Sequence, residues 1–68
     1  MVMAVTREQE LWAMALWVDG EHGEESERVI AERVLHFDSE GDEGGRQLWM
    51  DVARRHSSLQ KRAYKLAN

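Results

Sequence analysis

The side chains that could do chemistry are few and widely spaced. The chain of 68 residues has no cysteine, and its three histidines are His22, His36 and His56. No two histidines stand four residues apart, the spacing at which one helix offers two imidazoles to a metal ion. Ser57 and Ser58 follow His56 directly, but neighbours in a helix point about 100° apart, so neither is a good nucleophile beside that base. We therefore expect no catalytic residue, no metal site and no cofactor.

The acidic segment 38–44 alternates carboxylates in the way that a calcium-binding loop begins. The glycine that should follow the third ligand is replaced by Glu43, and Trp49 stands where the closing glutamate belongs. Capping of a helix by Asp42 explains the segment better. The thirteen acidic residues would allow a catalytic carboxylate pair, but such a pair needs a cleft, and a chain this small offers few. We expect that the protein is not an enzyme and has no small-molecule substrate.

Charge is divided unevenly along the chain, whose formal net charge is −4. Residues 19–43 contain ten acidic side chains and only two basic ones, Arg28 and Arg33. Residues 46–68 contain six basic side chains and one acidic one, Asp51. The simplest interpretation is that opposite charges meet across neighbouring helices or across a dimer.

The basic C-terminal segment also allows a second interpretation, a regulatory module that binds nucleic acid. Several of its side chains could contact phosphates. The acidic middle of the chain would repel the same phosphates, so this function ranks second. The candidate nucleic-acid contacts are Arg54, Arg55, Lys61, Arg62 and Lys65.

Tryptophan residues are the strongest site candidates. Residues 11–18 form an uninterrupted apolar run that includes two of the three tryptophans. A helix that is apolar on all sides must be enclosed, and a chain this short has little else to enclose it. We therefore predict a protein-interaction module that forms a homodimer through its first and third helices or binds another protein. The candidate contacts are Trp12, Leu16, Trp17 and Trp49, because aromatic anchors are common at interfaces. For Trp12 and Trp49 a place in the core is the preferred interpretation, and for Trp17 an interface is preferred.

The composition predicts helices separated by two breaks. Proline is absent, and the five glycines form two clusters, at 20–23 and 41–45. Thr6 with Gln9 makes a capping box, which predicts a first helix over about 7–19.

A second helix is predicted over about 25–38, with Ile30, Val34 and Phe37 as its buried stripe and Ala31 and Leu35 widening it. A third is predicted over about 43–66, where apolar residues alternate in steps of four and three. A break at the consecutive serines 57 and 58 is an alternative, because serine competes for backbone hydrogen bonds. The predicted fold class is all-α, a small bundle of three helices in one domain, 1–68.

The N-terminal residues 1–5 are apolar but lack the basic lead of a secretory signal. We expect them to be a disordered tail. The apolar run 11–18 is far shorter than the roughly 20 residues needed to cross a bilayer. A cytoplasmic protein that does not bind membranes is the expectation.

Residue pairs and short strings spread over most of residues 6–60 form a recognisable pattern of core and capping positions. They are Glu10-Leu11-Trp12-Ala13, Ala15-Leu16, His22-Gly23, Ile30-Ala31-Glu32-Arg33, Gly41-Asp42, Gly45, Trp49, Val52-Ala53 and Arg55. This pattern resembles a group of short uncharacterised alphaproteobacterial proteins, classed as a domain of unknown function. The resemblance implies a small bacterial cytoplasmic helical protein, and it brings no activity, cofactor or binding residue with it.

Overall fold

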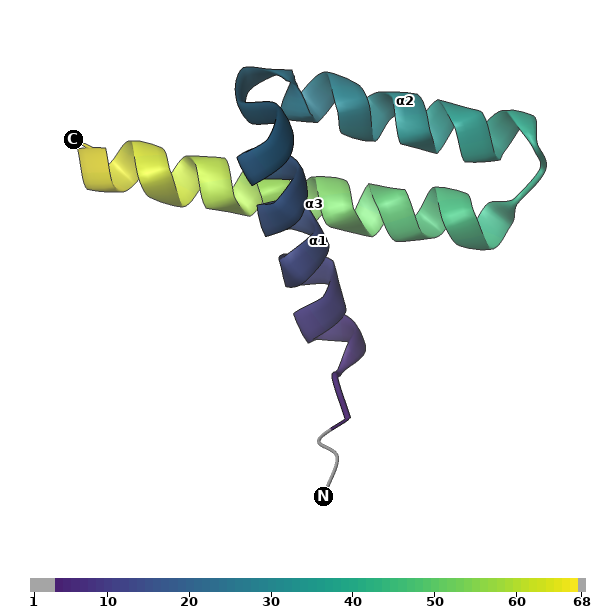
Figure 1. The fold of residues 1–68 in the computed structure, drawn as a ribbon, viewed down its shortest axis with the longest axis horizontal. Coiled ribbons are helices and arrows are strands. Elements are labelled where there is room, and N and C mark those ends of the chain that lie inside the picture. The colour runs from purple at the N-terminus through teal and green to yellow at the C-terminus, as the bar shows by residue number, and fades with distance from the viewer. Residues whose placement is uncertain (1–3, 68) are drawn as a thin grey trace.

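The computed structural model describes residues 4–67, with side chains described as far as residue 62. Helix α1 spans Arg7–His22, α2 spans Ser26–Ser39 and α3 spans Glu43–Ala67, and a short 3-10 turn, Gly23–Glu25, joins α1 to α2 (Figure 1). No strand occurs in this part of the chain. The predicted all-α fold of three helices is confirmed.

Helix α1 begins as predicted and ends later. The Thr6 hydroxyl accepts a hydrogen bond from the Gln9 backbone N–H at 3.1 Å, and the Thr6 backbone N–H donates to the Gln9 side chain at 3.0 Å. The helix runs three residues past its predicted end at Asp19, because Gly20 stays helical. A glycine inside a helix costs only about 1 kcal/mol, which is too little to end it. The chain turns instead at Gly23, where φ is +52°.

Helix α3 is capped as predicted, since the Asp42 carboxylate accepts a hydrogen bond from the Gly45 backbone N–H at 2.9 Å. The alternative of a break at Ser57 and Ser58 is wrong: the helix is continuous. The Ser58 hydroxyl donates to the Arg54 carbonyl at 3.1 Å, one turn earlier. A serine bonded in this way leaves the helical backbone intact.

Helices α2 and α3 form an antiparallel hairpin, and α1 lies steeply across one face of it (Figure 1). The remainder of α3 continues beyond α1, away from α2. The molecule is therefore flat, with extents of 42 × 38 × 17 Å. All three helices supply the small apolar core, which consists of Leu11, Ala15, Val18, Ile30 and Val52.

Residues 1–3 lie outside the described part of the chain, and with them most of the predicted disordered tail. Ala4 and Val5 are described, are exposed and belong to no helix. None of the described helices has the length and apolarity that a bilayer crossing would need.

Candidate interaction surfaces

The outer side of α1 is an uncharged apolar strip. Its members are Ala13, Leu16, Trp17 and Gly20, all exposed, which at about 100° per residue share the side of α1 opposite its buried residues. Leu16 keeps 57% of its surface exposed and Trp17 keeps 59%. Nothing lies within 4 Å of the position that a Gly20 side chain would take. We call these four residues the α1 strip.

Trp12 lies at the contact between α1 and α3, not on the α1 strip. Its indole is half-buried, and the indole N–H donates to the Glu8 carboxylate at 2.9 Å. The same carboxylate pairs with the Arg55 guanidinium of α3 at 2.5 Å. The hydrogen bond from Arg55, assisted by the one from Trp12, lowers the pKa of Glu8 below its ordinary value. Trp12 therefore belongs to the joint between two helices.

Trp49 is also half-buried, and it packs against the core. The guanidinium carbon of Arg33, on α2, lies 5.7 Å from the centre of its ring, within the range of a cation–π contact. Of the four predicted interface residues, the structure thus places Leu16 and Trp17 together on an open surface and the other two between helices.

A second apolar surface lies between α2 and α3, and sequence reasoning did not predict it as a site. It is a groove of about 530 Å³ to which α1 contributes no side chain. Leu35, at 67% exposed, stands on its α2 side, and Met50 lines its α3 side. Its polar lining residues are Glu27 on α2 and Arg54 and His56 on α3. We call this surface the hairpin groove; its apolar lining is Ile30, Ala31, Val34, Leu35, Met50 and Ala53.

The signal that could have revealed the groove is the width of the apolar arc on α2. Ala31 and Leu35 lie outside the stripe formed by Ile30, Val34 and Phe37, so a single neighbouring helix cannot cover them all.

A family model matches residues 7–64. This range includes α1, α2 and all of α3 except its last three residues. The chain belongs to DUF6961, a family of unknown function. No curated protein and no solved structure matches the chain. The DUF6961 match includes both the α1 strip and the hairpin groove, whereas Lys65 falls outside it.

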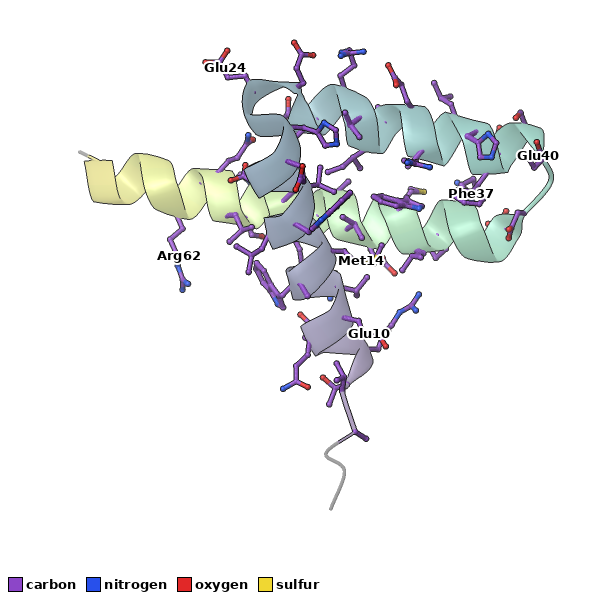
Figure 2. The ribbon with its side chains drawn as sticks, in the orientation of Figure 1. Glu10, Met14, Glu24, Phe37, Glu40 and Arg62 are labelled. Atoms are coloured by element: carbon purple, nitrogen blue, oxygen red, sulfur yellow. The ribbon has the colours of Figure 1, made fainter. Side chains whose placement is uncertain are left out.

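The predicted nucleic-acid contacts of this DUF6961 chain do not form one open basic surface. Arg54 pairs with Asp51 at 2.6 Å, and Arg55 pairs with Glu8. Lys61 and Arg62 are exposed, and Arg62 projects from the part of α3 beyond α1 (Figure 2). The side chain of Lys65 lies outside the described residues.

His56 is the one histidine that the structure buries among the residues it describes. It is only 1% exposed, and its Nε2 lies 3.0 Å from the Asp19 carboxylate. The reason is that α1 packs against this part of α3 and places the Asp19 carboxylate beside the ring. Among the described residues, no group of three or more His, Asp or Glu side chains is placed to hold a metal ion.

Proposed function

We propose that the chain is a small, non-enzymatic protein-interaction module that binds through apolar helix faces, and that a second copy of the chain is one partner. The observation that carries this proposal is the exposure of large apolar side chains on two surfaces of one flat molecule, Leu16 and Trp17 on α1 and Leu35 on the hairpin. Exposed apolar patches on a small protein mark interaction sites.

Sedimentation equilibrium between about 1 and 100 μM tests the proposal directly. We expect the mass of a dimer at the upper concentrations. A monomer mass throughout that range would overturn self-association.

We further propose that the protein works in a bacterial cytoplasm, as the resemblance stated above implies. The lack of cysteine fits this setting, since small secreted domains are commonly held together by disulfides.

Nucleic-acid binding is the second candidate, and the observation that favours it is the projecting end of α3 with its exposed Lys61 and Arg62. Fluorescence anisotropy with a labelled mixed-sequence DNA duplex tests it. Binding through phosphates would weaken steeply between 50 and 200 mM salt, by about 10³-fold or more for six contacts, whereas apolar self-association would not. Absence of binding at low salt would remove this candidate.

A further inference from the structure

We infer that the hairpin groove is the face on which the second copy docks, with α2 of each copy lying antiparallel over α3 of the other. This inference rests on the proposed self-association and assigns it a surface and a geometry.

The hairpin groove is open because α1 covers the opposite face. On α2, Val29 and Arg33 share a side with His22 at the end of α1, while Ala31 and Leu35 point about 120° to 160° away from them. The groove and α1 therefore lie on opposite faces of the α2–α3 hairpin. Packing a second hairpin on it would complete a four-helix bundle of two layers, the usual way in which amphipathic helix pairs bury their second apolar side.

The charges that line the groove fit a second copy of this chain. Glu27 on α2 and Arg54 on α3 both line the groove, and Arg54 also pairs with Asp51 of its own helix at 2.6 Å. The acidic lining residue thus stands on the α2 side and the basic one on the α3 side, at about the same level along the hairpin.

Rotation about a two-fold axis parallel to the helices keeps each residue at the same position along the hairpin. It places α2 of one copy over α3 of the other. It places Glu27 of one copy opposite Arg54 of the second copy, and the reverse, so both contacts are attractive. A two-fold axis across the helices would lay α2 on α2, and it would bring Glu27 of one copy towards Asp38 of the other. The charge pattern therefore selects the first arrangement.

The α1 strip is the competing surface, and it lies on the other side of the molecule. Two self-complementary contacts on opposite faces would add copies without end, so a closed dimer uses only one of them. The groove draws its apolar side chains from two helices and has matched charges, whereas the strip is a single helix side without charge. The strip is thereby left for another protein.

A matched pair of variants separates the two surfaces. Leu35→Glu and Trp17→Glu each place a carboxylate on a side chain that is already more than half exposed, so the folded monomer should tolerate both. We expect Leu35→Glu to raise the dimer Kd about 30-fold or more, as loss of a central anchor does. We expect Trp17→Glu to leave the Kd within about threefold, because a residue outside the interface contributes little.

A charge exchange tests the geometry without relying on Leu35. Glu27→Arg sets like charges against each other in its own homodimer, and so does Arg54→Glu. In a dimer of one copy of each variant both contacts become attractive again. We expect an equal mixture of the two variants to form heterodimers at concentrations where each alone is monomeric.

Each outcome decides between the claims. If the unaltered chain is a monomer, the proposed function and this inference both fail. If the unaltered chain dimerises but Trp17→Glu disrupts it, with or without an effect of Leu35→Glu, self-association stands and the groove assignment is overturned. A mixture of the charge variants with no preference for the heterodimer would overturn the arrangement of α2 over α3.

Discussion

Gly45, at the start of α3, has no room for a side chain because the ring of Phe37 lies close to its backbone. The Phe37 ring of α2 lies against it, near the connection between the two helices (Figure 2). A Cβ atom at Gly45 would come within 2.5 Å of Phe37 Cδ1, closer than real Cβ atoms approach. Glycine at this position lets α2 and α3 approach each other closely beside their connection.

Gly45→Ala should therefore destabilise the fold by about 1–3 kcal/mol, the range for an overpacked contact. Gly44→Ala is the matched control, since its Cβ would meet only Asp42 Oδ1 at an ordinary 3.6 Å. The control should be neutral or gain up to about 1 kcal/mol from helix propensity. Urea unfolding measures both, and an equal effect of the two substitutions would contradict the role given to Phe37.

Ser26 is fully buried, and its hydroxyl lies 2.7 Å from the Gly23 carbonyl and 3.2 Å from the Val18 carbonyl. Ser26→Ala should cost about 1–2 kcal/mol, because a buried acceptor loses its donor. Ser39→Ala is the control: Ser39 makes the same bond to a carbonyl three residues earlier, but it is exposed. The control should change the free energy of unfolding by no more than about 0.5 kcal/mol. A loss of similar size in both variants would show that burial of Ser26 adds nothing.

At the scale of elements, the joint between α1 and α3 depends on a few polar contacts around Glu8, which bonds Trp12 on its own helix and Arg55 on α3. The pKa of Glu8 is lowered in the fold, chiefly by the hydrogen bond from Arg55. Because this pKa is lowered, the Glu8 contacts contribute their full stabilisation at a pH above the pKa of Glu8 in the unfolded chain, about 4.3. That contribution disappears as the pH falls through the pKa of Glu8 in the folded chain.

Glu8→Gln should consequently be less stable than the unaltered chain at pH 7, and it should lose less stability on acidification. The effect is small, because exposed ion pairs contribute little. Urea midpoints at pH 7 and pH 3 measure it. Glu10→Gln removes an exposed carboxylate of the same helix that shows no ion pair among the described residues, and it should keep the acid sensitivity of the unaltered chain. Equal acid sensitivity of the Glu8 variant and the unaltered chain would exclude this role for the joint.

At the scale of the whole molecule, the flat arrangement of the helices leaves room for the proposed association. A chain of about this length buries only roughly 60% of its unfolded surface, and three helices arranged in an extent of 17 Å leave both faces thinly covered. A second copy would therefore contribute part of the stability of the folded state.

The melting temperature should accordingly rise with protein concentration, by roughly 3–6 °C for each tenfold increase. Leu35→Glu should abolish this dependence, and Trp17→Glu should retain it. Circular dichroism melts over two decades of concentration provide the measurement, and a melting temperature independent of concentration would count against a stabilising dimer.

Local signals determined much of the fold. The Thr6 and Asp42 caps act within three or four residues along the chain, so their helix starts could be read from the sequence. The ends were harder to predict, because Gly20 is able to stay helical, and only the backbone at Gly23 shows where α1 stops.

The site depended on tertiary structure to a greater degree. The sequence by itself determined that residues 11–18 are apolar on all sides of a helix, which is more than one helix stripe can bury. Which face stays open was decided by where α1 lies on the hairpin: it places Trp12 at the joint with α3 and buries His56 beside Asp19, and it leaves the groove beside Leu35 uncovered. Helical periodicity determines which residues share a side of each helix. Only the packing of the three helices against one another determines which of these sides are in contact.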